Sequence, residues 1–245
     1  MFPVLQIGSL ALPVPGLALL LGVWIGLWLA ATRKEAARLG INPETVYNLA
    51  FIGIVAGLIG ARLAYVARYL NVYASDPLSV FSLNPATLAP AEGVWIGVVA
   101  AVIYGARRQL PLRLTLDALA PAVAVMGVAV AVAHVASGDA FGAAARLPWS
   151  VYLWDEYRHP SQIYELIAAL GVLGIGWRAR ARGPFVGFNF LLVVALSAAA
   201  RVFLEAFRGD SLVIVCGLRA AQVWGLIVLA ACLGAMRYSG WEAVS

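Results

Sequence analysis

The sequence predicts an all-α integral membrane protein, a bundle of seven transmembrane helices that forms a single domain over residues 1–245. Hydrophobic residues make up 63% of the chain and charged residues only 12%, whereas soluble domains are about 45–50% apolar and about 25% charged. The chain also contains seven apolar stretches, most of them long enough to cross a bilayer core about 30 Å thick. Basic residues gather in the connections on one side of this predicted bundle.

The excess of basic residues has a membrane explanation. The chain has 17 Lys and Arg against 12 Asp and Glu, and Lys and Arg in the cytoplasmic loops of a membrane protein explain this excess. A water-soluble fold of this composition would expose large apolar patches. Composition therefore excludes a cytosolic enzyme and a nucleic-acid-binding module. The two cysteines, Cys216 and Cys232, are too few for a disulfide framework or a zinc site, so we expect no metal.

Each expected helix is an apolar run that ends at charges or at Pro and Gly. The runs are 12–32, 46–69, 93–106, 114–137, 160–177, 185–207 and 217–236. Basic residues follow the first, third, fifth and seventh runs, namely Arg33, Lys34, Arg38, Arg107, Arg108, Arg113, Arg178, Arg180, Arg182 and Arg237. The opposite loops, 70–92, 138–159 and 208–216, are richer in acidic and aromatic residues. By the positive-inside rule, the N-terminus is outside and the C-terminus is cytoplasmic.

Ionisable residues within the expected helices are candidates for function, because each costs about 2.5–3.5 kcal/mol to insert into a membrane. They are Arg62, Asp117, His134, Glu165, Arg201 and Glu205. Arg201 and Glu205 are four residues apart and share a helix face with Arg208, so they can form an ion pair. A self-neutralising pair and a site for a lipid phosphate both fit this spacing.

Three of these residues have structural alternatives. Arg62 fits a structural counter-ion and a phosphate ligand equally well, among small residues that allow close helix contact. Asp117 is expected to be solvated or to cap a helix. His134 either accepts a proton near neutral pH or is simply hydrogen-bonded. We further expect Arg62, Glu165 and Arg201 to point into one central cavity.

The clearest local pattern is Arg158-His159-Pro160-Ser161-Gln162-Ile163-Tyr164-Glu165. Proline is favoured in the first turn of a helix, so the pattern predicts an outer loop that turns into the fifth helix. The N-terminal end of a helix carries partial positive charge and free N–H groups, which suit an anion such as phosphate. The alternative is an ordinary capped helix start.

These features together resemble the bacterial prolipoprotein diacylglyceryl transferases over roughly residues 16–236. The stretch 158–165 is one match. The others are 60–65 for the family's G-[GA]-R-x-G-Y, 137–142 for N-G-E-x-[YF]-G, 148–151, 201–208 for R-F-x-x-E-F-x-R, and 217–222 for G-L-x-x-x-Q. The matches also follow one another in the family's order and spacing.

The resemblance implies a multi-pass transferase of the bacterial plasma (inner) membrane. Members move the diacylglyceryl group of phosphatidylglycerol to the lipobox cysteine of prolipoproteins, so the implied partners are phosphatidylglycerol and the prolipoprotein signal segment, without a cofactor. The thiol must lose a proton and the departing phosphate gains charge, which requires a base and fixed cations. The resemblance implies Arg201 and Glu205 as catalytic residues, and His134 is a third candidate because its imidazole can accept a proton. The implied substrate-binding residues are Arg62, Asp139, Arg158, His159, Ser161, Gln162, Glu165 and Gln222.

The chain departs from the family pattern at several central polar positions. Family tyrosines fall on Pro15 and Ser197, a histidine falls on Ala91, and a phosphate-binding arginine falls on Ala131. An asparagine of the family becomes His134. One hypothesis is that His134 and Glu92 rebuild the site.

Two other functions fit the sequence. One is a non-catalytic homologue that binds phospholipid or lipoprotein. The other, outside the family, is a small membrane transporter with Arg62, Glu165 and Glu205 along its path, although the chain lacks the internal repeats of that class.

Overall fold

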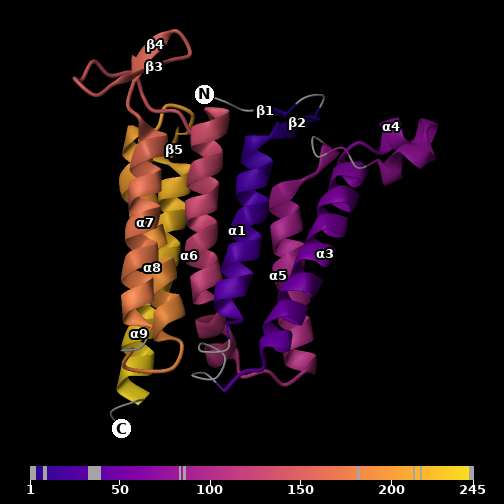
Figure 1. The fold of residues 1–245 in the computed structure, drawn as a ribbon, viewed down its shortest axis with the longest axis vertical. Helices are drawn as coiled ribbons and strands as arrows, with labels where there is room; N and C mark the ends of the chain where they lie inside the picture. The colour runs from indigo at the N-terminus through magenta and orange to yellow at the C-terminus, as the bar shows by residue number, and fades with distance from the viewer. Residues whose placement is uncertain are drawn as a thin grey trace.

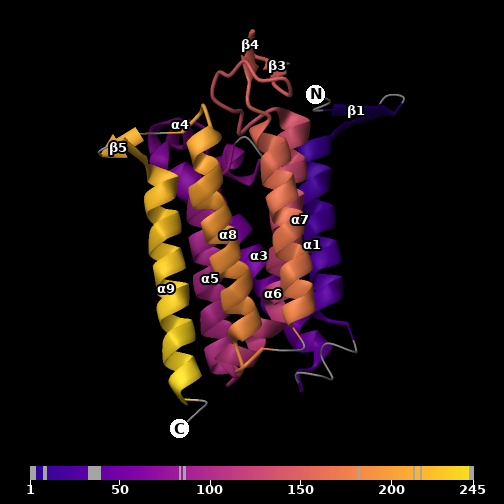
Figure 2. The ribbon, with the colours of Figure 1, turned by 90° about the vertical axis from the view of Figure 1, so that its left-hand side faces the viewer.

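The computed structural model describes residues 4–7, 10–32, 40–82, 84, 87–180, 183–211, 213–215 and 217–242. Within them, seven helices of 17 to 26 residues run side by side (Figures 1 and 2). These are α1 (Val14–Ala30), α3 (Pro43–Arg68), α5 (Pro90–Arg107), α6 (Leu112–Ser137), α7 (Ser161–Ala179), α8 (Phe188–Leu204) and α9 (Ala220–Glu242). Arg33, Lys34, Arg38, Arg182 and Cys216 lie outside the described residues.

Four of the described helices are long and apolar enough to cross a membrane. They cover Pro43–Arg68, Leu112–Ser137, Phe188–Phe207 and Ala220–Ser239, whereas Val14–Ala30 is apolar but shorter. The predicted class of a mostly helical chain with membrane-spanning helices is therefore confirmed. The two termini lie at opposite ends of the bundle (Figure 1).

Short antiparallel hairpins, which the sequence analysis did not predict, precede or join the helices. They are β1 (Val4–Ile7) with β2 (Leu10–Pro13), β3 (Val151–Leu153) with β4 (Glu156–Arg158), and β5 (Val213–Val215) with β6 (Leu218–Arg219). The short helices α4 (Leu70–Ser75) and η1 (Pro77–Phe81) follow α3, and η3 (Glu205–Phe207) extends α8. All of these lie at the end of the bundle opposite the C-terminus (Figures 1 and 2).

Local sequence explains where the helix ends differ from the predicted runs. The third helix starts three residues early because Pro90 occupies its first turn, where proline's fixed φ is already helical. The last helix starts three residues late because Leu218–Arg219 pairs as a strand. The first starts late for the same reason, since Leu10–Pro13 is also a strand.

Glycines bring two pairs of helices into close contact. A methyl group added at Gly57 of α3 would lie 2.9 Å from the Gly93 carbonyl oxygen of α5, and one at Gly97 would lie 2.5 Å from the Gly53 oxygen. In the same way, α1 lies against α6, where a methyl group at Gly22 would lie 2.3 Å from the Ala129 Cβ. Small residues are the usual means by which membrane helices approach closely.

Asp117 joins two helices, because this α6 side chain caps the start of α8. Its carboxylate accepts hydrogen bonds from the backbone N–H of Gly187, at 2.6 Å, and of Phe190, at 3.0 Å. The side chain is buried, so the predicted capping role is confirmed and the solvated alternative is wrong. Gly187, at φ +95°, supplies the left-handed turn that points both N–H groups at Asp117.

Replacing Asp117 by alanine is expected to lower the free energy of unfolding by about 1–3 kcal/mol, because it leaves two N–H groups without their acceptor. Thermal unfolding of the purified protein in detergent measures this loss. Asp117→Asn keeps one acceptor oxygen and should fall between the wild type and Asp117→Ala. Equal melting temperatures for all three proteins would contradict this role for Asp117.

Candidate functional site

A pocket of about 120 Å³ lies between α6, α7 and α8, near the end of the bundle that carries the β3–β4 hairpin. Its charged lining is gathered at one end and consists of Glu165, Arg201, Glu205 and Arg208. Ser161 and Ser197 also line it. The remaining lining residues are Ala, Gly, Val and Leu. The pocket therefore has charged side chains of both signs at one end and apolar side chains along the rest.

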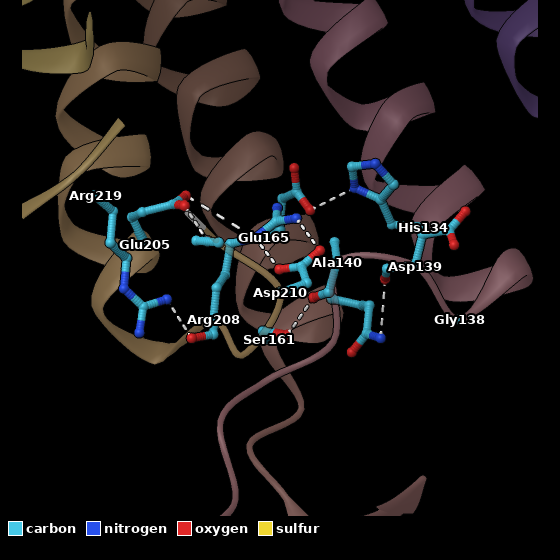
Figure 3. Close-up of polar contacts among 12 residues, drawn as sticks. His134, Gly138, Asp139, Ala140, Ser161, Glu165, Glu205, Arg208, Asp210 and Arg219 are labelled. Carbon is cyan, nitrogen blue, oxygen red and sulfur yellow. Dashed lines mark hydrogen bonds and ion pairs between the residues drawn. The ribbon is translucent and has the colours of Figure 1, made fainter. Parts of the chain in front are cut away.

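The charged side chains form a continuous chain of contacts (Figure 3). His134 Nδ1 lies 2.7 Å from Glu165 Oε2, and Glu165 Oε1 lies 4.0 Å from Arg201 Nη1. Arg201 Nε lies 3.1 Å from Glu205 Oε2, which confirms the predicted ion pair. Arg208 Nε lies 3.9 Å from the same oxygen. These contacts thus link α6, α7 and the end of α8.

Glu205 is the most buried member of this chain of contacts. Its side chain is 1% exposed, whereas those of Arg201 and Arg208 are 40% and 13% exposed. The Ser211 hydroxyl donates a hydrogen bond to Glu205 Oε1. A buried carboxylate is stable only when it is paired and hydrogen-bonded. Glu205 therefore fixes the positions of the two arginines, while Arg201 remains accessible.

Asp210 holds Arg208 through two hydrogen bonds, with Nε–Oδ1 and Nη2–Oδ2 distances of 2.9 and 2.7 Å. Burial alone would raise the pKa of Asp210, but the hydrogen bond and the charge of Arg208 outweigh it and lower that pKa. Burial would likewise lower the pKa of Arg208, and its bond to Asp210 instead raises it. Both groups are therefore charged at neutral pH, and the stabilisation they provide is lost as the pH falls through the lowered pKa of Asp210.

The start of α7 is anchored to the loop that follows α6. The Ser161 hydroxyl donates to the Ala140 carbonyl oxygen at 2.5 Å, and Gln162 Nε2 donates to the Asp139 carbonyl oxygen at 3.1 Å (Figure 3). The side chain of Asp139 itself is exposed. Ser161 and Ala140 line the pocket, whereas Gln162 and Asp139 do not, so the latter two help to position its wall.

Arg62 does not line the pocket, and the expectation that it points into the same cavity as Glu165 and Arg201 is wrong. Its guanidinium donates to the carbonyl oxygens of Ser79, at 2.5 Å, and of Val80 and Thr87, both at 2.8 Å. Arg62 does not act as a counter-ion to a carboxylate either, because its described partners are carbonyl and hydroxyl oxygens. Arg62 therefore fastens the connection between α3 and α5 to the end of α3.

Replacing Arg62 by alanine is expected to release this connection, because each hydrogen bond from a charged donor contributes about 1.5–3 kcal/mol. Hydrogen exchange followed by mass spectrometry should show faster exchange across Pro77–Phe81. Arg68→Ala is the control, because it removes only an exposed ion pair with Glu92 at the same end of α3. Equal exchange in the two variants would contradict the fastening role.

Three more predicted binding residues face other parts of the structure. Arg158 donates to the carbonyl oxygens of Leu153 and Gly142, so it holds the β3–β4 hairpin. The His159 ring packs edge-on against Phe207, with ring centroids 5.3 Å apart. Gln222 accepts a hydrogen bond from the Arg219 backbone N–H and donates one to the Val202 carbonyl oxygen. None of these three residues lines the pocket, and their role in substrate binding stays a prediction.

The positions that depart from the family pattern also have defined places. Ala131 is fully buried in α6, one turn before His134. Ser197 lines the pocket, and its hydroxyl donates to the Val193 carbonyl oxygen at 2.8 Å. Pro15 lies in the first turn of α1 and Ala91 in the first turn of α5. Glu92 pairs with Arg68, whereas His134 does not line the pocket but joins its charged end through Glu165.

Sequence reasoning missed two members of the site. Asp210 follows Arg208 by two residues, a spacing that could have indicated the pair. Ser211 gave no signal, because its contact with Glu205 depends on how the chain turns after η3. Within the described ranges, no group of three or more His, Cys, Asp or Glu side chains is arranged to hold a metal ion.

Comparison with known proteins identifies the family. Residues 3–238 match the sequence model of the family described as prolipoprotein diacylglyceryl transferase. The phosphatidylglycerol–prolipoprotein diacylglyceryl transferase of Clostridioides difficile (strain 630) is 30% identical over 217 residues, which cover 86% of this chain and 84% of that protein. Proteins with this name from Streptomyces coelicolor and Synechococcus elongatus are 30% and 27% identical; they align with 98% and 92% of this chain, and 74% and 82% of their own lengths are covered. The chain therefore belongs to the prolipoprotein diacylglyceryl transferase family.

Proposed function

We propose that this chain moves the diacylglyceryl group of phosphatidylglycerol to the lipobox cysteine of prolipoproteins in the pocket between α6, α7 and α8. One observation carries the proposal: the pocket has two arginines at one end and small apolar side chains along the rest. Such a pocket suits an anionic amphiphile, with its phosphate at the arginines and an acyl chain among the alanines. The names of the relatives support the same reaction.

The placement in the membrane is part of this proposal. All seven long helices cross the bacterial inner membrane as one domain, with the N-terminus outside and the C-terminus in the cytoplasm. The positive-inside distribution of Arg107, Arg108, Arg113, Arg178 and Arg237 supports this orientation. The charged end of the pocket then faces the outer leaflet, on the side where secreted prolipoproteins arrive.

The proposed reaction is a displacement at the glyceryl carbon that is bonded to the phosphate. The cysteine sulfur forms a bond to this carbon, the carbon–oxygen bond breaks, and its electron pair leaves with glycerol phosphate. Arg201 and Arg208 stabilise the charge that develops on the phosphate, in a site where fixed cations are most effective. Glu205 holds both arginines in position.

His134 is the proposed acceptor of the thiol proton. Its Nδ1 faces the carboxylate of Glu165, and an ionised Glu165 would orient the neutral ring with its proton on Nδ1 and Nε2 as the acceptor. The three carboxylates of Glu165, Glu205 and Asp210 exceed the two positive charges of Arg201 and Arg208 by one negative charge. A proton on His134 balances this excess at the moment when the phosphate gains charge. His134 thus partly replaces the arginine that the family pattern has at Ala131.

The other predicted binding residues have supporting roles in this proposal. Ser161 is close enough to the charged end of the pocket to contact the head group. Arg62, Asp139, Arg158, His159, Gln162 and Gln222 act through the loops and helix ends that they hold. The bound partners are thus phosphatidylglycerol and the prolipoprotein signal segment, and we propose neither a cofactor nor a nucleic-acid partner.

The test is to incubate the purified protein with phosphatidylglycerol and a lipobox peptide, and to detect the thioether product by mass spectrometry. We expect product from the wild type and its loss in Arg201→Ala. The family's arginine is replaced at Ala131 and its tyrosine at Ser197. These replacements favour one alternative, a homologue that binds lipid without catalysis. Lipid that co-purifies with the wild type but yields no product would identify that homologue, and solute flux in liposomes would identify a transporter.

A further inference from the structure

A thin wall of small side chains closes the apolar end of the pocket. Ala124 and Val172 line the pocket at this end, and they belong to a buried cluster that also contains Ala120 and Val193. A second, much smaller space of about 10 Å³ lies on the other side of this cluster. Ala124 lines both spaces, so the wall between them is about one side chain thick.

Val193 fills the middle of this wall. Its side chain is 1% exposed, and a methyl group added at Gly176 of α7 would lie 2.6 Å from Val193 Cγ2. Valine at this position of α8 therefore fills the room that Gly176 leaves between the two helices. Val193 lines the smaller space but not the pocket itself, so removing its two methyl groups would enlarge the space directly behind Ala124 and Val172.

The depth of the pocket can be compared with the length of a lipid chain. Arg201 marks the charged end and Val193 the closed end, and eight residues of α8 separate them, or about 12 Å at 1.5 Å per residue. One leaflet of a bilayer core about 30 Å thick is about 15 Å deep. An acyl chain that descends from a phosphate at Arg201 and spans its leaflet would therefore reach Val193 before its end.

We propose that Val193 and Val172 set the longest acyl chain that the pocket accepts. The preferred ligand is then an anionic phospholipid whose enclosed acyl chain is short enough to end at this wall. This inference rests on the proposed function, because it places the lipid phosphate at Arg201. Each enclosed methylene adds packing contacts with the pocket wall, and methylenes beyond the wall add none because they remain outside the pocket.

The test measures how strongly purified protein binds saturated phosphatidylglycerols that differ only in acyl-chain length, by competition in native mass spectrometry. For the wild type, affinity should rise with chain length while the added methylenes contact the pocket wall, and then level off. In Val193→Ala the rise should continue to longer chains before it levels off. Val172→Ala should shift the limit in the same direction, and it provides a second readout if Val193→Ala folds poorly.

Val46→Ala is the matched control. Val46 is 2% exposed and lies in a separate buried cluster with Ala30 and Ala118, so this variant loses the same two methyl groups from a site of equal burial. Its length limit should equal that of the wild type.

Three results would overturn the proposal. They are an unchanged limit in both wall variants, an equal shift in Val46→Ala, and a wild-type affinity that is independent of chain length. These results leave the proposed function intact. Failure of every phosphatidylglycerol to bind would instead overturn the proposed function and, with it, the length limit.

Discussion

Replacing Arg201 by alanine is expected to slow diacylglyceryl transfer by about 10²–10³-fold, the usual effect of removing one group that stabilises transition-state charge. Arg201 is the more exposed of the two pocket arginines, so its charge is available to the phosphate. Its loss also leaves Glu205 buried beside a single arginine. The rate of thioether formation under saturating phosphatidylglycerol measures the effect.

Two variants separate catalysis from folding in this experiment. Arg201→Lys keeps the charge but loses the planar, two-pronged donor geometry, and it should fall between the wild type and Arg201→Ala. Arg68→Ala removes an exposed arginine from a pair remote from the pocket and should transfer at the wild-type rate. A wild-type rate in Arg201→Ala would show that the phosphate is bound elsewhere.

Replacing His134 by asparagine is expected to slow transfer by about 10²–10⁴-fold, the range typical of a lost general base. Asparagine is the residue of the family pattern at this position, and it can donate and accept hydrogen bonds but cannot take up the thiol proton. Single-turnover rates of the wild type and His134→Asn provide the measurement.

The other histidine of the chain offers the matched control for this prediction. His159 packs against Phe207 outside the pocket, so His159→Asn should transfer at the wild-type rate. Because Glu165 acts through His134, His134→Asn with Glu165→Gln should be no slower than His134→Asn alone. Additive losses in the double variant, or an equal loss of rate in His159→Asn, would assign the proton to another group.

The sequence was a good guide to the helices and to contacts within one helix. Apolar runs of bilayer length predict helices because every backbone group must be satisfied inside lipid. The ion pair between Arg201 and Glu205 follows from their four-residue spacing, which places both on one face of α8.

Contacts between helices were harder to predict. Nothing in the sequence places His134 beside Glu165, which lies 31 residues later, because the contact depends on how α6 and α7 rotate against each other. The prediction that Arg62 points into the cavity is wrong for a related reason. Its partners lie 17 to 25 residues away in the connection that folds back over α3, and the path of such a connection depends on packing and turns that no short motif records.

The account depends most on where the phosphate of the lipid lies, and a cryo-electron microscopy structure with phosphatidylglycerol bound in a lipid nanodisc tests this directly. We predict density for the phosphate between Arg201 and Arg208, with one acyl chain between α6, α7 and α8 that ends at Val193. Phosphate density elsewhere would contradict the account, as would a lipid confined to the apolar groove that Val23, Ile54 and Met126 line between α1, α3 and α6.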